Sequence, residues 1–544
     1  MIRSFRLFFP ATSHHLFYGM FLMASVVSAI FYCSFANLFI TNQFINMGTV
    51  LKTAYAVYPS VKLKGFKTDS KTGKKKFTFI KELLFGDYIK PYVSHNDYVR
   101  IKVTENKKEM EYVKVRCRNA DGYIKESEMQ AERILEINFV DVGQGDGCHI
   151  VTPDDKHFLI DSGGSDNMYR FLKWRFNLKT SKVPPPPFTV VISHSDSDHY
   201  QGFGKIFGKM KEAAQQFNIP IIYHNGMVEA SGANLDSLGT IVTHNGCKYV
   251  TDLCDTPADY DKRVASLEKT GVYINTLNKS SAPKQALRLG SAPIYDQAGL
   301  KMEVMGPVPS QINGKDALPV FESNKGKTKN GHSIILKLTM GHLRLLLGGD
   351  LNTESEYHLI HHFSNIDIAE IKKQLKSKSM DEAKRAALQS QIEESILKAR
   401  KELGVDIAKS CHHGSADFTS EFLRVLNPIA TIISSGDDEP HTHPRPDTLG
   451  TIGKHSRGER SLIFSTELAR SGKEFVELDK IDPEKKKERT VTVYGMINVR
   501  TDGEKVIIAQ KLEKPASGRN WDIHKLEWNQ EKEEFEYNQY QMYE

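Results

Sequence analysis

The sequence predicts an α+β protein that carries a small all-β barrel and one transmembrane helix at its N-terminal end. Three observations lead to this expectation. An apolar run lies before residue 46, short alternating segments fill residues 48–130, and strand patterns that end in His and Asp motifs alternate with helical stretches after residue 134. With 544 residues, the chain is long enough for several domains.

The composition is that of an ordinary globular protein, with 26% charged and 40% hydrophobic residues. The formal net charge of +6 is small for this length, so it makes no general case for nucleic-acid binding. None of the six cysteines has a CxxC spacing. We therefore expect neither a disulfide framework nor a zinc knuckle.

The apolar run from Leu16 to Ile40 contains no charged residue and, at about 25 residues, can cross a bilayer as a helix. A cleaved signal peptide is the alternative, because VSA at 27–29 resembles a cleavage site. Arg3 and Arg6 precede the run, which favours a single-pass anchor with the bulk of the protein outside the cytoplasm. If translation starts at Met47, the protein would instead be cytoplasmic.

The segments between residues 47 and 131 alternate polar and apolar residues and are separated by Gly and Asp-Gly, which predicts a small antiparallel barrel. The blocks GDYIKPY, DYVRIKV, EYVKVRC and DGYIKESEM resemble bacterial Src-homology-3-like domains. That resemblance implies contact with peptides or cell-wall material. A spacer that holds the rest of the chain away from the membrane is the alternative.

The segment TVVISHSDSDHYQGF, Thr189 to Phe203, reads as a buried strand followed by a polar loop. The loop carries His194, Asp196, Asp198 and His199 within six residues. Two carboxylates would be unfavourably crowded there unless a cation neutralised them, and a divalent metal is the simplest choice. A polar turn with an acidic helix N-cap is the alternative reading.

Further polar motifs follow predicted strands along the chain, namely DVGQGDG, LIDSGG, LLLGGDL, KSCHHGS and HTHPRP. Asp350 ends the strand HLRLLL, where a carboxylate is costly unless it is paired, so it is a candidate for bridging two metal ions. Glu356, shortly after it, is expected on an exposed helix face. In HTH, the alternation of an extended chain puts His441 and His443 on the same side.

Together and in this order, the motifs resemble the metallo-β-lactamase superfamily, and within it the hydrolase-like domain of ComEC competence DNA-uptake proteins, from about Ile134 to about Val506. The resemblance implies an αββα sandwich of metallo-β-lactamase type that binds one or two divalent ions. The implied metal ligands are His194, Asp196, Asp198, His199, Asp350, His412 and His413, with the choice between the last two open. Asp141, Asp161 and Ser415 would support these ligands, and His443 would be a ligand or the proton donor to the leaving group.

The residues and the resemblance predict a metal-dependent hydrolase. Many relatives have a histidine at the position of Asp196, so the ligand set here is richer in oxygen and favours Zn²⁺ or Mn²⁺. Asp198 is placed to hold metal and to orient the attacking water. The favoured target is a phosphodiester bond, as in a nuclease. The alternatives are an ester or cell-envelope hydrolase and a degenerate binding protein, and DNA transport does not carry over because only one membrane span is expected.

The expected divisions are 1–46 for the tail and membrane anchor, 47–131 for the barrel, 132–512 for the hydrolase domain with a helical insertion at 365–403, and 513–544 for a C-terminal tail. The insertion is charged and shows little apolar face, so we expect a helical hairpin at the surface.

Overall fold

The computed structural model describes residues 50–178, 180, 182–210, 215–436, 441–467, 477–478, 491–492, 496–516 and 518–537. The transmembrane segment expected at 16–40 lies outside these residues. Within the described ranges, no helix combines the length and the apolar character needed to span a membrane.

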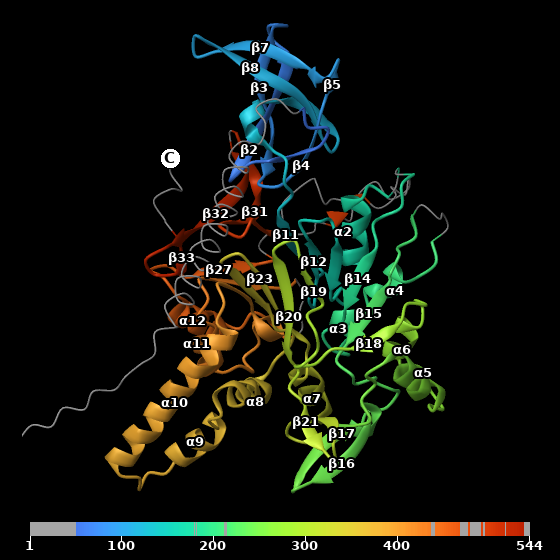
Figure 1. The fold of residues 1–544 in the computed structure, drawn as a ribbon, viewed down its shortest axis with the longest axis vertical. Helices are drawn as coiled ribbons and strands as arrows, with labels where there is room; N and C mark the ends of the chain where they lie inside the picture. Colours follow the sequence, from blue (N-terminus) through green and yellow to red (C-terminus); the bar gives the residue numbers. More distant parts are fainter. Residues whose placement is uncertain are drawn as a thin grey trace, which may run out of the picture.

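Two large sheets form the centre of the molecule (Figure 1). The first has the order β18-β15-β14-β13-β12-β11-β30-β31-β32-β33. Its strands are β11 (Leu135–Val140), β12 (Cys148–Val151), β13 (His157–Ile160), β14 (Phe188–Val191), β15 (Ile221–His224), β18 (Lys284–Ala286), β30 (Met496–Thr501), β31 (Lys505–Ala516), β32 (Arg519–Asn529) and β33 (Glu534–Tyr537). The second has the order β19-β20-β23-β24-β25-β26-β27. Its strands are β19 (Tyr295–Gln297), β20 (Leu300–Gly306), β23 (Ile335–Met340), β24 (Leu343–Leu347), β25 (Ile407–Lys409), β26 (Ala430–Ile433) and β27 (Leu462–Ser465).

The sheets face each other across one apolar core. Ile137 and Ile150 of the first sheet and Leu345 and Ile432 of the second belong to the same buried cluster. Alternate residues of each strand point to the opposite face, where helices cover them. Burial on both faces explains the continuous apolar runs in the sequence of these strands.

Helices cover the outer faces of both sheets. On the first sheet these are α2 (Asn167–Arg175), α3 (Ser197–Tyr200), α4 (Phe203–Ile206), α5 (Pro257–Ala265) and α6 (Val272–Leu277). On the second they are α8 (Thr353–Ser364), α9 (Ile368–Leu375), α10 (Glu382–Leu403) and α11 (Ser420–Leu426), with α12 (Pro446–His455) packed beside α11. The four layers are the αββα arrangement that the resemblance implied.

The insertion at 365–403 forms α9 and α10, and these helices are part of the covering layer. Leu388, Ile392, Ile396, Ala399 and Leu403 repeat at helical spacing and lie in the outer core of the second sheet. This apolar stripe is one residue wide and long charged side chains flank it, so the sequence pattern predicted a surface hairpin. The insertion therefore supports the sheet.

Five chain segments that follow strands meet at one edge of the sandwich. Strands β13, β14 and β15 run parallel, as do β24, β25 and β26. Parallel strands place their carboxyl ends at the same edge, and loops at that edge are the usual place for a site in such sheets. The loops after β13, β14, β24, β25 and β26 carry most of the motifs named above.

The barrel expected at 47–131 is an antiparallel sheet of eight strands around a separate apolar core that includes Leu63, Ile89 and Val115. Its strands are β1 (Ala54–Ala56), β2 (Ser60–Thr68), β3 (Lys75–Leu84), β4 (Tyr88–Pro91), β7 (Arg100–Glu105), β8 (Lys108–Cys117), β9 (Ala120–Ile124) and β10 (Met129–Gln130), with the short pair β5 (Val93–Ser94) and β6 (Asp97–Tyr98) beside it. The Src-homology-3-like assignment stays a prediction.

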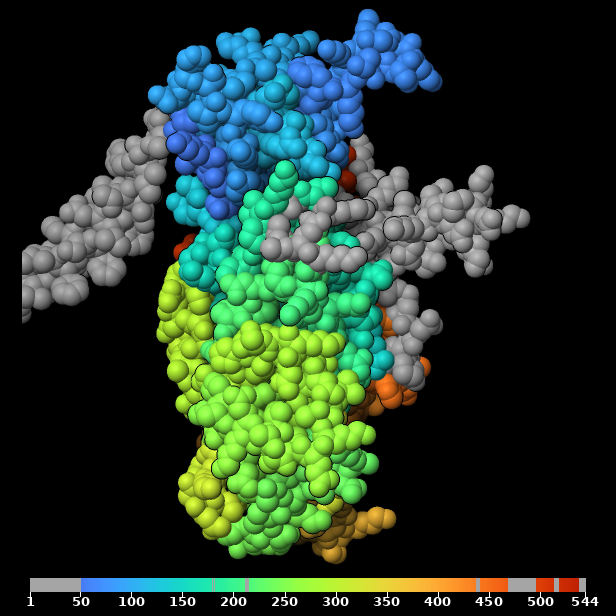
Figure 2. Space-filling model, turned by 90° about the vertical axis from the view of Figure 1, so that its right-hand side faces the viewer, coloured from blue at the N-terminus to red at the C-terminus, as the bar shows by residue number. Residues whose placement is uncertain are grey.

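The barrel packs against one end of the sandwich (Figures 1 and 2). The buried Glu82 carboxylate accepts hydrogen bonds from the backbone N–H groups of Asn520, at 2.8 Å, and Trp521, at 3.2 Å. These residues begin β32, which lies beyond the expected domain end at residue 512. The expected tail 513–544 is therefore corrected over its described residues to Tyr537, because β32 and β33 extend the first sheet.

The region 219–329, which the sequence left without clear elements, contributes a small antiparallel sheet at the other end of the molecule (Figure 1). Its strands are β16 (Thr240–His244), β17 (Cys247–Thr251), β21 (Ser310–Ile312) and β22 (Lys315–Pro319). Helix α7 (Lys325–Gly331) then leads into β23 and brings Lys329 and Asn330 to the loop after β14.

Candidate metal centre

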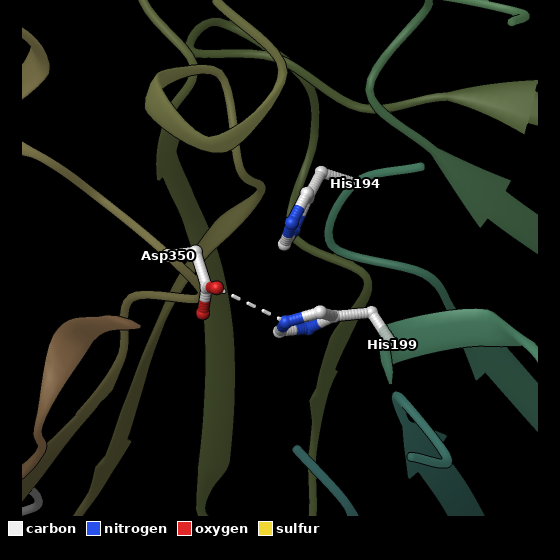
Figure 3. A group of neighbouring side chains, drawn as sticks. All are labelled: His194, His199 and Asp350. Carbon is white, nitrogen blue, oxygen red and sulfur yellow. Dashed lines mark ion pairs between the residues drawn. The ribbon is translucent and has the colours of Figure 1, made fainter. Parts of the chain in front are cut away.

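The loop after β14 brings two imidazoles toward the carboxylate of Asp350, which follows β24 (Figure 3). His199 Nε2 lies 3.2 Å from Asp350 Oδ2. Ligand atoms of His194, His199 and Asp350 all lie within 4.8 Å of one another, and all three residues are buried. Residues about 150 positions apart in the chain therefore form one polar cluster between the two sheets.

His413 completes the cluster from the loop after β25. Its Nε2 atom lies 3.2 Å from Asp350 Oδ2 and 3.5 Å from Asp198 Oδ2. Its Nδ1 atom lies 3.0 Å from the Ser434 carbonyl oxygen, which accepts the hydrogen bond and leaves Nε2 directed to the cluster. His412 is half-buried, with Nε2 3.9 Å from Asp350 Oδ2. Of the two histidines that the sequence could not separate, His413 lies inside.

Asp161 holds the orientation of His199. Its Oδ2 atom lies 2.8 Å from His199 Nδ1 and accepts a bond of 2.6 Å from the Ser193 hydroxyl, and Oδ1 accepts a bond of 2.7 Å from Ser193 N–H. A carboxylate on the second nitrogen fixes the ring of a metal-binding histidine and raises its basicity. Asp161 therefore lies behind the proposed metal ligand His199 and supports it, and the resemblance implied this supporting role.

The glycine at 145 lets the DVGQGD loop approach the loop after β14. Gly145 has a φ of +105°, and a Cβ atom there would lie 1.7 Å from the Asp198 carbonyl oxygen. Any larger residue would force the two loops apart. The close approach of the two segments therefore keeps Asp198 near the centre, together with Asp146, which follows Gly145 in the DVGQGD loop.

Asp146 and Lys409 belong to the centre, although the sequence analysis did not select them. Lys409 is 3% exposed and forms an ion pair with Asp146, while its Nζ atom lies 3.8 Å from Asp350 Oδ1. Burial lowers the pKa of Lys409, but Asp146 and Asp350 outweigh it and raise the pKa. The signal that could have found this residue is a lysine in the buried strand β25, directly before the HHGS motif.

Asp196 points to a different partner. One oxygen forms an ion pair with Lys329, and Oδ2 lies 3.7 Å from His194 Nε2. With its amide correctly oriented, Asn330 also donates to Asp196 Oδ2 at 2.6 Å. Burial raises the pKa of Asp196, but His194 and Lys329 together lower it to about 2. Among the described residues, Asp196 is in none of the groups whose geometry suits a metal ion.

The remaining predicted residues lie around the cluster. His443 is half-buried, and its ring centroid lies 5.8 Å from that of His412 and 6.2 Å from that of His413. Asp141 is buried and accepts a hydrogen bond of 3.0 Å from Gly143 N–H, so it shapes the DVGQGD loop. The Ser415 hydroxyl accepts from Asp417 N–H at 3.1 Å, within its own turn.

The donor set fits a divalent metal. Among the buried side-chain atoms of the described residues that have no hydrogen-bond partner are several at this centre, including His199 Nε2, His413 Nε2 and Asp350 Oδ1. A tetrahedral zinc with bonds of about 2.0 Å separates its ligand atoms by about 3.3 Å. The two separations of 3.2 Å between these imidazoles and Asp350 Oδ2 match that value. Burial alone raises the pKa of Asp350, but His199 and His413 keep it well below its usual range.

Two facing sheets with a buried His and Asp centre at one edge form the arrangement that the resemblance to the metallo-β-lactamase superfamily implied. In sequence, the chain is similar to ComE operon protein 3 of Bacillus subtilis (strain 168), with 22% identity over 337 residues. The match covers 59% of this chain and 31% of that protein, so the chain spans about a third of its relative. The resemblance predicted from the motifs is therefore confirmed.

Two solved structures are similar at lower levels. Tm1679, a metal-dependent hydrolase of the beta-lactamase superfamily, has a TM-score of 0.29 and 12% identity, with 61% of this chain and 96% of that one covered. A protein of Parabacteroides distasonis ATCC 8503 has a TM-score of 0.25 and 12% identity, with 67% and 99% covered. No protein-family model matches the chain. The relationship therefore rests on the sequence match.

Proposed function

We propose that this protein is a metal-dependent hydrolase that cleaves phosphodiester bonds with one divalent ion, Zn²⁺ or Mn²⁺. The observation that carries the proposal is the convergence of the Nε2 atoms of His199 and His413, which have no hydrogen-bond partner among the described residues, on the carboxylate of Asp350. Asp198 and His194 complete the proposed ligand set.

A bound ion would polarise a phosphoryl oxygen and lower the pKa of a water molecule toward neutrality. Asp198 is placed to accept a proton from that water, because its side chain is 16% exposed while Asp350 is 4% exposed. Burial raises the pKa of Asp198, but His413 and His199 lower it strongly, so the group is a carboxylate at neutral pH. His443, at the rim, is placed to donate a proton to the leaving group.

The proposal of one ion rests on Asp196. In a centre with two ions, this carboxylate would be available to the second ion. Lys329 occupies that role here, because its ammonium group pairs with Asp196 and lies 3.2 Å from Glu229 Oε2. The similarity to a ComEC protein supports a phosphodiester as the substrate class.

The test is to measure metal content and turnover of the purified protein on single-stranded DNA, double-stranded DNA and a chromogenic phosphodiester. We expect one bound ion per chain and hydrolysis that stops in Asp198→Ala. Asp447→Asn, an exposed aspartate in the first turn of α12, is the control and should keep full activity. Turnover of an ester or envelope polymer with all phosphodiesters untouched would establish the alternative hydrolase. A protein without metal would be a binding protein.

We also propose that residues 16–40 anchor the chain in a membrane, with the barrel on the outer side near peptides or cell-wall material. The apolar run and the two preceding arginines support this. Fractionating cells that express the chain from Met1 or from Met47 tests it. Both forms in the soluble fraction would contradict the anchor.

A further inference from the structure

The hairpin formed by β2 and β3 of the barrel ends in a basic turn. The two strands pair as far as Thr68 and Lys75, so residues 69–74 form the turn. Between Phe66 and Phe77 the chain carries one acidic residue, Asp69, and five exposed lysines, namely Lys67, Lys71, Lys74, Lys75 and Lys76. The end of the hairpin therefore presents a concentrated positive charge to solvent, and such a charge attracts polyanionic surfaces.

The acidic groups near the hairpin leave most of this charge unpaired. Asp69 Oδ2 lies 3.4 Å from Lys76 Nζ, and Asp69 Oδ1 accepts hydrogen bonds from two backbone N–H groups of the turn. Glu105 pairs with Lys64 at 2.9 Å, further from the turn. Within the residues that the structure describes, the other four lysines at the end of the hairpin form no ion pair. These four ammonium groups are therefore free to meet an anionic partner.

Aromatic rings form an apolar patch beside the turn. Phe66 and Phe77 lie opposite each other on β2 and β3, with ring centroids 5.1 Å apart. The ring of Tyr123, from β9, lies 6.1 Å from that of Phe66, and the ring of Tyr112, from β8, lies 5.1 Å from that of Phe77. None of these four residues belongs to the apolar core of the barrel, and Phe66 is 51% exposed. The patch is therefore an outer surface of the barrel.

Lysines beside an exposed ring favour a lipid bilayer over other polyanions. Lysines are attracted to anionic headgroups, while an aromatic ring gains free energy when the headgroup region covers it. A polymer of charged groups would use the lysines and leave Phe66 in water. The rings are tilted or edge-on to one another, at interplanar angles from 53° to 77°. They therefore offer no parallel faces on which the bases of a nucleic acid could stack.

We propose that the β2–β3 hairpin docks on the surface of an anionic phospholipid bilayer, with its lysines at the headgroup phosphates and Phe66 at the same level. The position of the barrel near a bilayer rests on the proposed anchor at 16–40. Residues 41–49 separate that segment from Val50, the first described residue, and an extended chain of this length reaches at most about 35 Å. The hairpin would then be a second contact, and it would set the orientation of the sandwich relative to the bilayer.

The test reconstitutes the full chain into vesicles of phosphatidylcholine, with or without about 30% phosphatidylglycerol. Trypsin cleaves after exposed lysines, so its rate of cleavage after residues 71–76 measures the accessibility of the turn. Cleavage after Lys378 is the reference in the same molecules, because Lys378 is exposed between α9 and α10, at the end of the molecule opposite the barrel (Figure 1). We expect the turn to be cleaved at least about tenfold more slowly on the anionic vesicles. Salt at about 0.5 M should remove this protection.

Two variants separate the charge from the ring. Lys74→Gln/Lys75→Gln keeps other lysines of the turn as cleavage sites and should reduce the protection to about twofold or less. Phe66→Ser keeps every lysine and should reduce the protection by about threefold or more. The matched control is Lys384→Gln/Lys401→Gln, which removes the same charge from exposed positions of α10 and should be protected like the wild type.

Equal cleavage of the turn on both kinds of vesicle, or an equal loss of protection in the α10 control, would overturn the proposal. Protection by an added oligonucleotide or anionic wall polymer, with none by the anionic lipid, would also overturn it and assign the turn to that ligand. Flotation separates these results from the anchor. A chain that floats with anionic vesicles alone would lack the anchor and support the hairpin contact, whereas a chain that floats with neither kind would overturn both.

Discussion

Asp196 and Asp198 lie two residues apart at the N-terminal end of α3, and the structure gives them different surroundings. Asp198 Oδ2 lies 3.5 Å from His413 Nε2, and Oδ1 lies 4.0 Å from His199 Nε2. Asp196 is paired with Lys329 from α7. One carboxylate therefore joins the proposed metal ligands, while the other is neutralised by a lysine that is more than 100 residues away in the chain.

The difference teaches that the motif alone does not set the number of ions. A crowded acidic loop needs positive charge, but a metal ion and an ammonium group both supply it. The partner that folding brings to each carboxylate decides which one is used. Asp146 follows the same rule, since Lys409 pairs with it at the floor of the centre.

The largest expected effect is from Asp350→Asn, which removes the carboxylate that both His199 and His413 approach. We expect loss of bound metal and a fall in kcat/KM of about 1000-fold, equivalent to about 4 kcal/mol. The Asp196→Asn variant should keep its metal, and its kcat/KM should fall far less. Elemental analysis and steady-state kinetics test this, with the exposed Asp252→Asn as control. Equal losses in the Asp350 and Asp196 variants would remove the distinction drawn here.

Glu356 is a buried carboxylate that has no basic partner among the residues that the structure describes. The sequence predicted an exposed helix position for Glu356, but its side chain is 2% exposed and accepts a hydrogen bond from Thr419 N–H. Burial raises its pKa to about 8, whereas an unfolded glutamate titrates near 4.5. The folded state therefore holds a proton that the unfolded state loses, and stability should fall by about 3 kcal/mol as pH rises from 5 to 8.

Urea unfolding at several pH values measures this effect. Glu356→Gln, which cannot ionise, should flatten the fall, and Glu382→Gln, at an exposed position, should not change it. Parallel curves for the wild type and the Glu356 variant would show that Glu356 is ionised in the folded protein at neutral pH.

Asp161→Asn is expected to have a smaller effect on metal binding than Asp350→Asn, because Asp161 acts through His199. Loss of the carboxylate behind a metal-binding histidine lowers metal affinity by about 10- to 100-fold. Competition with a chromophoric chelator measures the affinity directly. The exposed Asp236→Asn is the matched control. An unchanged affinity would mean that His199 needs no support from Asp161.

The smallest effect on activity, about tenfold or less, is expected from Lys329→Met, which removes the partner of Asp196. With excess metal, this variant should take up a second ion at Asp196, and native mass spectrometry would count it. Lys325→Met is the control, because Lys325 contacts Glu229 at 2.7 Å but is not paired with Asp196. A wild-type protein that already binds two ions would contradict the proposed role of Lys329.

The fold was predictable where local patterns repeat. Buried strands ending in polar motifs predicted the α+β core, and alternation predicted the barrel. The domain end was misplaced, because the last strands, such as β32, alternate polar and apolar residues and look like a tail until the first sheet pairs with them. The helical insertion was read as superficial because its apolar stripe is narrow.

The candidate site was partly predictable for the same reason. His194, Asp198, His199 and Asp350 stand out because several ligand-type residues follow buried strands. Lys409 did not, because a single lysine in an apolar strand gives no sign of the acids that will face it. His412 and His413 are adjacent and chemically equal, so only the turn that buries His413 separates them.

The amino-acid sequence by itself determined which segments become strands and which residue types stand at their ends, since those choices depend on local pattern and burial. Only the tertiary structure decided which charged side chains pair with each other. Pairings such as Asp196 with Lys329 and Asp146 with Lys409 join distant segments, and electrostatic energy depends on separation in space, which sequence spacing does not contain.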